Sequence, residues 1–294
     1  MKPMSILLTI DGSAESRSAA YIAWQLAKKT GSSITAQHVI DSLAVWKFLS
    51  FKSAGFIGSG PYMEACERIK EALHAVAESL FLAYNSQAEG QGLNNRNYID
   101  EGDFVSCICE RAKEHDLVIV GHSLERTNDF YLELGKMCSA PVLVIQKSTM
   151  PWSKVCILLT DETVNEDTIW DISEFGSDLG LPTELYLHSS YGKEHTLRWA
   201  NKLACVRGLP VAAIRHAYDG YAMNPGTLMV PVSNSTTDVG ANVITDYLMD
   251  NSAVLIWPSE HIKKPATKEK QPATKEKQAS IHPAKDSQRS RKAS

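Results

Sequence analysis

Apolar and polar positions alternate in two regular ways along the first half of the chain. Short apolar runs that end in turn residues are typical of strands buried in a parallel sheet, and they occupy residues 6–10, 33–41, 97–100, 116–121 and 141–146. Between them, apolar residues recur every three to four positions, which is typical of helices that cover such a sheet. Because predicted strands and helices alternate, the pattern favours an α/β fold with right-handed parallel crossovers.

The first predicted strand ends in the turn signal Asp11-Gly12-Ser13, and a helical pattern follows at once. Open α/β sheets bind ligands outside the carboxyl ends of their strands, so Asp11 is predicted to lie at a ligand-binding edge. Ser13 or Ser16 is expected to cap the helix, and Gly31 is expected to end it. Residues 41–62 are expected to form a long, partly ordered connection with one helical turn, of the kind that is usually functional or a lid.

The clearest predicted helices cover residues 63–84, 104–115 and 128–138. In the first of these, apolar side chains form one stripe that predicts packing on the core: Ile69, Leu73, Val76, Ala77, Leu80 and Phe81. Asp103 is a candidate N-cap for the second helix.

The second half repeats the first in a shortened form. The letters SILLTID at residues 5–11 return as CILLTD at residues 156–161. Strands are predicted at 154–160, 184–188, 210–214 and 227–232, helices at 165–180 and 193–206, and a last helix and strand within 240–258. The sequence therefore predicts two tandem five-stranded parallel units, one at 1–150 and a shortened one at 151–258.

Length and composition agree with this division. The 294 residues are 44% hydrophobic and 22% charged, which suits two globular domains. No apolar run approaches the roughly 20 residues of a membrane span, and no secretory signal precedes the first strand, so a cytoplasmic location is expected. The six cysteines are expected to be buried small apolar residues. Cys107 and Cys109 point to different sides of a helix, which disfavours a shared metal.

Residues 259–294 differ from the rest of the chain. They hold ten Lys or Arg and four Asp or Glu, while the whole chain has a formal net charge of −4. They also contain a direct repeat, PATKEKQ at 265–271 and again at 272–278. With so few large apolar residues, the segment is predicted to be a disordered tail. It is interpreted as solubilising, with a weak contact to an acidic surface as the alternative; nucleic-acid binding is disfavoured because no aromatic residues accompany the cations.

The first half resembles the universal stress protein family in five segments that follow the family's order: ILLTIDGS at 6–13, HVID at 38–41, EGD at 101–103, DLVIVG at 116–121 and APVLVI at 140–145. The resemblance covers nearly all of residues 4–147. It implies a five-stranded Rossmann-like sheet of the adenine nucleotide alpha hydrolase-like kind, and dimerisation through the last strand. The two copies in this chain would supply both halves of such a dimer.

The nucleotide-binding branch of that family places ATP across the carboxyl ends of strands one, two and four. Candidate binding residues implied by the resemblance are Asp11, Gly12, Val39, Gly121, His122, Ser123 and Asn128. In that branch, small residues after strand four let backbone amides close on the phosphates. Here Leu124 and Leu134 stand where two of the family's glycines are expected, and Glu125 and Asp129 add negative charge that Arg126 partly offsets. Tight ATP binding is therefore disfavoured, although ATP or another adenine nucleotide stays open as a ligand.

Other chemical signals leave alternatives open. His38 and His122 are expected near the carboxyl edge, either as ligand-binding groups or simply hydrogen-bonded. In the second half, the polar run at 233–237 before Gly240 suits an anion or ordinary capping, and Asp161 is displaced by one residue relative to Asp11. The sequence contains no P-loop, no HExxH and no nucleophile elbow, so no catalytic residue and no metal ligand are assigned.

Two classes of function follow. The first is a non-enzymatic tandem stress protein that acts by binding a protein partner or a small ligand, as an internal pseudo-dimer that could pair further into a homodimer. The alternative is a nucleotide-binding or ATP-hydrolysing protein on the same scaffold. The fold alone does not choose between them; the incomplete glycine loop and the missing catalytic set favour the first.

Overall fold

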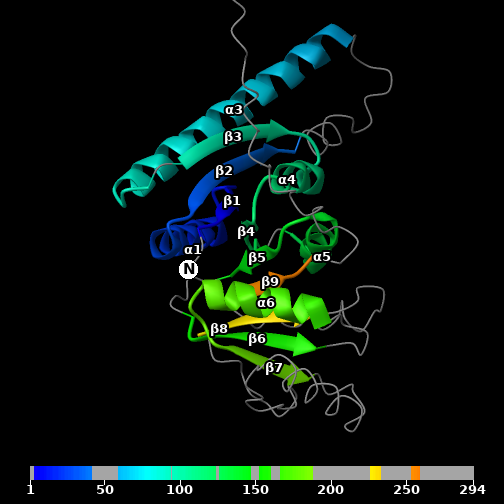
Figure 1. Ribbon diagram of the computed structural model, residues 1–294. Helices are drawn as coiled ribbons and strands as arrows, with labels where there is room; N and C mark the ends of the chain where they lie inside the picture. Colours follow the sequence, from blue (N-terminus) through cyan, green and yellow to red (C-terminus); the bar gives the residue numbers. More distant parts are fainter. Residues whose placement is uncertain are drawn as a thin grey trace, which may run out of the picture. The chain divides into compact units, whose positions relative to one another are not determined.

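The strands of the protein form one sheet of nine, in the order β3-β2-β1-β4-β5-β9-β8-β6-β7 (Figure 1). This computed structural model describes residues 3–41, 59–93, 95–123, 126–146, 152–159, 166–187, 226–232 and 253–258. All of them belong to a single compact unit that extends to Lys263. The connection 42–58 and the tail 259–294 lie outside the described residues.

The first half contains the five parallel strands and the helices that the sequence predicts. Its elements are β1 Ser5–Thr9, α1 Ala14–Thr30, β2 Ser33–Ile40, α3 Ser59–Glu89, β3 Asn95–Glu101, α4 Phe104–Ala112, β4 Leu117–Gly121, α5 Asn128–Met137 and β5 Val142–Ile145. The boundaries of two of these helices differ from the prediction. The helix α3 begins at residue 59 rather than 63 and ends at 89 rather than 84. The helix α4 ends at Ala112 rather than at residue 115. The N–H groups of residues 113–115 donate to carbonyls three positions earlier instead of four, which is a turn pattern and not an α-helical one.

The second half has the elements β6 Lys154–Leu159, α6 Glu166–Asp178, β7 Thr183–Leu187, β8 Thr227–Val232 and β9 Ala253–Ile256. Both β7 and β8 pair in parallel with β6, and β9 pairs in parallel with β8. The strand predicted at 210–214 and the helices predicted at 193–206 and after residue 240 lie outside the described part of the chain. The predicted boundary between residues 150 and 151 does too.

The two halves meet where β5 pairs antiparallel with β9, from Val142 opposite Ile256 to Ile145 opposite Ala253. Outward from this seam, the first half continues with β4, β1 and β2, and the second with the corresponding strands β8, β6 and β7. Each half therefore presents its last strand to the other and repeats the same strand succession. Gly135 of α5 also packs on this seam, since a Cβ there would lie 2.3 Å from Ile256 Cγ2.

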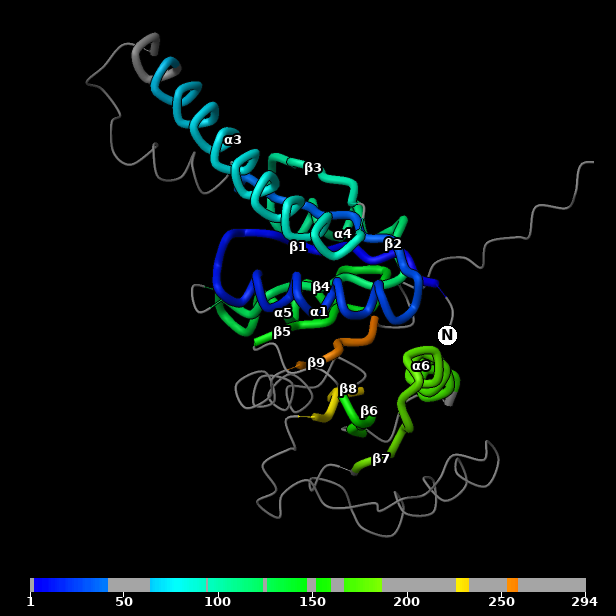
Figure 2. Tube along the Cα trace, turned by 90° about the vertical axis from the view of Figure 1, so that its left-hand side faces the viewer, coloured from blue at the N-terminus to red at the C-terminus, as the bar shows by residue number. Residues whose placement is uncertain are grey.

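The helices cover both faces of this sheet. One face carries α1, α3 and α6 over an apolar cluster that continues from the first half into the second (Figures 1 and 2). On that face Trp24 of α1 donates its indole N–H to the Tyr84 hydroxyl of α3, at 3.1 Å. The other face of the first half carries α4 and α5, whose apolar side chains pack on β1, β4 and β5 and also on β9. Because both faces of the first half are covered, its central strands β1, β4 and β5 are buried and mostly apolar, as the runs in the sequence require.

The predicted ends of α1 are confirmed. Ser13 is the N-cap, and its hydroxyl oxygen accepts the Ser16 N–H at 3.0 Å. Ser16 instead accepts the Asp11 N–H on its own hydroxyl oxygen, at 3.2 Å. Gly31 ends the helix with φ 72°, a left-handed conformation that favours glycine. The turn after β1 is thus fixed by side-chain bonds between the strand end and the first helical turn.

A close backbone contact joins β4 to the start of α1. Gly121, the last residue of β4, lies so near this turn that an added Cβ would meet the Ser16 amide nitrogen at 2.5 Å and the Glu15 carbonyl carbon at 2.6 Å. Backbone atoms cannot move aside as a flexible side chain can. A glycine is therefore required here by packing.

We expect Gly121→Ala to lower the free energy of unfolding by about 1–3 kcal/mol, because the new methyl group would force the strand away from the helix. Gly90→Ala is the matched control, since its added Cβ meets only carbonyl oxygens at 3.5 Å and its backbone is unstrained. That control should change stability by less than about 0.5 kcal/mol. Urea unfolding measures both; equal stability of the two variants would contradict the close contact.

Candidate functional site

The candidate residues lie along the edge where β1, β2 and β4 end. Asp11 and Gly12 follow β1, Gly121 ends β4, and Asn128 opens α5. The structure brings Asp11 and Gly121 together indirectly, because both contact Ser16 at the start of α1. Val39 does not join them through its side chain, which is buried in the apolar cluster beneath α4.

Asp11 is exposed at the carboxyl end of β1. One oxygen of its carboxylate accepts the Ser13 N–H at 3.0 Å, which makes a tight turn typical of Asp. Gly12 has φ 85°, and a Cβ there would lie 3.1 Å from Leu80 Cδ2 of α3. The turn therefore needs glycine for its backbone conformation and for close packing.

The two candidate histidines are each hydrogen-bonded to a different neighbour. His38 Nδ1 lies 2.6 Å from the Ile10 carbonyl oxygen, and His122 Nε2 lies 3.0 Å from Asn128 Oδ1. The His122 ring also stacks on Tyr131 with 4.7 Å between ring centroids. Each histidine is thus hydrogen-bonded through one ring nitrogen, and its part in ligand binding stays a prediction.

The chain that follows β4 folds back onto Tyr131. The Ser123 N–H donates to the Tyr131 hydroxyl oxygen at 2.7 Å, and this hydroxyl donates to the Gly121 carbonyl at 3.1 Å. Tyr131 is fully buried, and burial raises the pKa of its hydroxyl to about 12. The group therefore keeps its proton at neutral pH and can serve as donor and acceptor at once.

Two more of the backbone amides described in this loop also have acceptors. The His122 N–H donates to the Ile145 carbonyl at 2.8 Å, and the Arg126 N–H donates to the Ser123 carbonyl at 3.2 Å. An amide cradle for phosphate needs N–H groups that point outward together. The N–H groups of His122 and Ser123 donate to partners in the core, and that of Arg126 closes a local turn within the loop. Leu124 and Glu125 lie outside the described residues.

The charge near this loop is not arranged to attract an anion. The Arg126 guanidinium lies over the Phe104 ring at 3.6 Å and near the Phe130 ring at 4.6 Å, in a cation–π arrangement. Asp129 adds an exposed carboxylate in the first turn of α5, where a negative side chain stabilises the helix end. The start of α5 near Asn128 is as predicted from the sequence.

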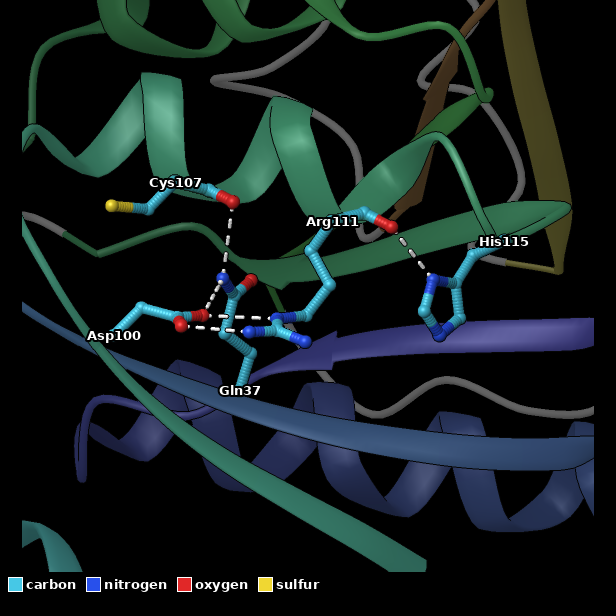
Figure 3. A network of polar contacts seen from close by, with 5 residues as sticks. All are labelled: Gln37, Asp100, Cys107, Arg111 and His115. Carbon is cyan, nitrogen blue, oxygen red and sulfur yellow. Dashed lines mark hydrogen bonds and ion pairs between the residues drawn. The ribbon is translucent and has the colours of Figure 1, made fainter.

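A partly buried polar network under α4 was not predicted from the sequence (Figure 3). Asp100 accepts two bonds from Arg111, at 2.7 and 2.9 Å, and a third from Gln37 Nε2 at 2.7 Å. Gln37 also donates to the Cys107 carbonyl at 3.1 Å, and its Oε1 is buried with no hydrogen-bond partner in the described structure. The signal in the sequence is a glutamine among the mostly buried positions of β2.

Two cavities lie away from the carboxyl edge of β1 and β4. One, of about 530 Å³, adjoins the network and is mostly acidic, lined by Asp100, Glu101, Ser106, Cys107, Glu110, Arg111 and Glu114. The other, of about 520 Å³, lies beside α1 and is lined by Tyr21, Gln25, Leu26, Lys28, Lys29, Trp152, Leu179 and Leu181. Both volumes are of the size that holds a small ligand.

Within the described ranges, no three His, Cys, Asp or Glu side chains gather as a metal site would require. Nor is any described helix both long and apolar enough to cross a bilayer. The polar run 233–237 and Asp161 of the second half lie outside the described residues.

Comparison with known proteins gives a likeness in fold. The chain superimposes on a universal stress protein from Archaeoglobus fulgidus with a TM-score of 0.54 and 14% identity, covering 87% of this chain and 97% of that one. A weaker likeness is to a functionally unknown protein from Pseudomonas aeruginosa, with a TM-score of 0.47 and 17% identity over 88% of this chain and 93% of that one. Another is to a universal stress protein family protein from Arabidopsis thaliana with AMP bound, with a TM-score of 0.35 and 14% identity over 49% of this chain and 92% of that one.

No family model and no curated protein matches the sequence. The likeness to the Archaeoglobus protein is one of fold, and it extends over both halves of the chain.

We expect Tyr131→Phe to lower the free energy of unfolding by about 1–3 kcal/mol, because the buried Ser123 N–H loses its acceptor. Tyr21→Phe is the control, since Tyr21 is 43% exposed. Chemical unfolding of both variants makes the comparison. A Tyr131→Phe variant as stable as the control would show that the hydroxyl does not hold the loop.

The Asp100 network makes stability depend on pH. Burial alone would raise the pKa of the Asp100 carboxyl, but hydrogen bonds from Arg111 and Gln37 lower it overall. A depressed pKa means that ionised Asp100 stabilises the fold above its unfolded pKa of about 3.9, and that this contribution is lost as the pH falls through the folded value.

Asp100→Asn should therefore have a lower melting temperature than the unchanged protein at pH 7, and the difference between the two melting temperatures should become smaller toward pH 3. Thermal unfolding of both proteins across this pH range measures the difference. A difference that stays constant with pH would contradict the stabilising role of ionised Asp100.

Proposed function

We propose that the chain is a tandem universal stress protein that works without catalysis, by binding a small ligand or a protein partner. The fold supports the family assignment. The two matching strand successions about the β5–β9 seam support an internal pseudo-dimer, in which one chain supplies both halves. A cytoplasmic stress-response role is part of this proposal.

The single observation that carries the proposal is that backbone amides of the loop after β4 already donate hydrogen bonds within the protein. Its amides at His122, Ser123 and Arg126 donate to Ile145, Tyr131 and Ser123. Opening them for a triphosphate would cost the hydrogen bonds of a buried tyrosine. With no cradle and with Asp129 exposed beside it, the site offers little to the charged phosphates that an ATPase must hold.

The cavity beside α1 supports small-ligand binding of another kind. Lys28 and Lys29 lie at its rim with the Tyr21 and Trp152 rings, and Lys29 Nζ donates to the Leu179 carbonyl at 2.6 Å. Cations next to aromatic and apolar side chains favour a small amphipathic anion. The nearest lining residue on α1, Tyr21, is seven residues from the start of the helix, so the cavity begins roughly 10 Å along α1 from the carboxyl edge.

A second candidate function is adenine nucleotide binding through the nucleoside rather than the phosphates. The exposed Asp11 carboxylate at the end of β1 favours it, because a carboxylate at that edge can accept hydrogen bonds from ribose hydroxyls.

Calorimetric titration with ATP and with adenosine distinguishes these proposals. ATP should bind no more than about threefold more tightly than adenosine, since no amide cradle stabilises its phosphates. Asp11→Asn should abolish any adenosine binding, whereas Glu174→Gln, an exposed acid on α6, should preserve it. No phosphate should be released from ATP.

ATP affinity more than about tenfold above that of adenosine would contradict the account of the loop. ATP turnover that disappears in Asp11→Asn but persists in Glu174→Gln would contradict the non-enzymatic function. If adenosine binding is absent in every variant, the nucleoside proposal fails while the non-enzymatic one stands.

A further inference from the structure

Two thiols from different helices meet in the core between α4 and α5. Cys109 lies on α4 and Cys138 is the residue at which α5 ends, and their sulfur atoms are 2.8 Å apart. This is closer than the roughly 3.5–4.0 Å of an ordinary non-bonded contact between carbon atoms. Both are free thiols, 8% and 0% exposed. The fold therefore holds the pair nearly in bonding position.

We propose that Cys109 and Cys138 are a modification site, at which a peroxide converts the two thiols into an intramolecular disulfide. The sulfur atoms need to approach from 2.8 Å to the roughly 2.05 Å of a disulfide. The proposal does not depend on the ligand-binding function.

The two sulfurs have different parts in this reaction. The hydrogen bond from Cys138 lowers the pKa of the Cys109 thiol, while the same contact and burial raise the pKa of Cys138. The thiolate is the nucleophile in cysteine oxidation. Because Cys109 is 8% exposed and Cys138 is not exposed at all, Cys109 is the sulfur that meets the oxidant, and Cys138 resolves the product.

The chemistry balances with hydrogen peroxide as the oxidant. The Cys109 thiolate attacks one peroxide oxygen, the O–O bond breaks, and Cys109 becomes a sulfenic acid while hydroxide leaves and takes up a proton. The Cys138 sulfur then attacks the sulfenic sulfur, the S–S bond forms, and a second water leaves. Two thiols lose two electrons in all, and one peroxide is reduced to two waters.

The other described cysteines lack such a partner sulfur within bonding distance. Cys107 lies two residues from Cys109, but its side chain points away from the network in Figure 3, and burial and the nearby Asp100 raise the pKa of its thiol. Burial raises the pKa of Cys156 to about 12. Cys107 is thus the matched control: it is on the same helix and more exposed than Cys109.

A bond between Cys109 and Cys138 would tie α4 to the end of α5. The helix α5 carries Asn128 and Tyr131, which hold the loop after β4. The modification would therefore fix the helix pair beside the candidate site.

The test exposes the folded full-length chain to hydrogen peroxide, blocks the remaining thiols under denaturing acid conditions, and maps the peptides by mass spectrometry. Two of the six cysteines should escape alkylation, with a loss of about 2 Da, and one linked peptide should join Cys109 to Cys138. After reduction with dithiothreitol, both cysteines should be alkylated again. Cys107→Ser should keep the link, and Cys109→Ser or Cys138→Ser should abolish it.

The unchanged protein supplies the result that does not depend on the folding of any variant. A linked peptide that includes Cys107, or alkylation of both Cys109 and Cys138 in the folded, peroxide-treated chain, would overturn the proposal. So would a link that forms no faster in the native chain than in urea, because the proposal requires the fold to bring the thiols together.

Discussion

The arrangement at the carboxyl edge depends on one buried hydroxyl group. Tyr131 of α5 accepts the Ser123 N–H and donates to the Gly121 carbonyl, so the end of β4 and the start of the loop are tied to a helix in the core. On the other side, Gly121 packs closely against the first turn of α1. These two contacts hold the end of β4 in place, and the amides of His122 and Ser123 already donate to Ile145 and Tyr131. Our proposal that this edge does not hold a triphosphate rests on these bonds.

The seam between β5 and β9 gives the second constraint. Because the two last strands pair antiparallel, backbone hydrogen bonds join the halves into one sheet, and the apolar cluster under α1 and α6 is continuous across it. Gly135 lets α5 approach Ile256 of β9, so a helix of the first half packs directly on a strand of the second. A shortened second half therefore still completes the core of the first.

Local sequence signals predicted much of the fold. The strands, the Ser13 cap, the Gly31 helix end and the start of α5 follow from hydrophobic period and turn chemistry, which act over a few residues. The importance of Gly121 was also anticipated, but for a different reason: the glycine serves close packing on α1, a contact between segments about 100 residues apart. Contacts of that range are not encoded in any local pattern.

The same limit explains what sequence reasoning missed. The sequence around Tyr131 does not indicate that its hydroxyl bonds to Ser123, and Gln37 is one of several polar residues in β2, so the sequence does not single it out. The cysteines were expected to be buried, and Cys109 and Cys138 are. That two of them face each other depends on how α4 packs against α5, which tertiary structure alone decides.

Amide hydrogen exchange at Ser123 and His122, followed residue by residue with and without saturating ATP, tests the central claim most directly. Both amides should exchange slowly in the free protein, because each donates to a partner inside the core, and ATP should leave their rates unchanged. Fast exchange in the free protein that ATP slows markedly would show that these amides are available to phosphate, and would contradict the account.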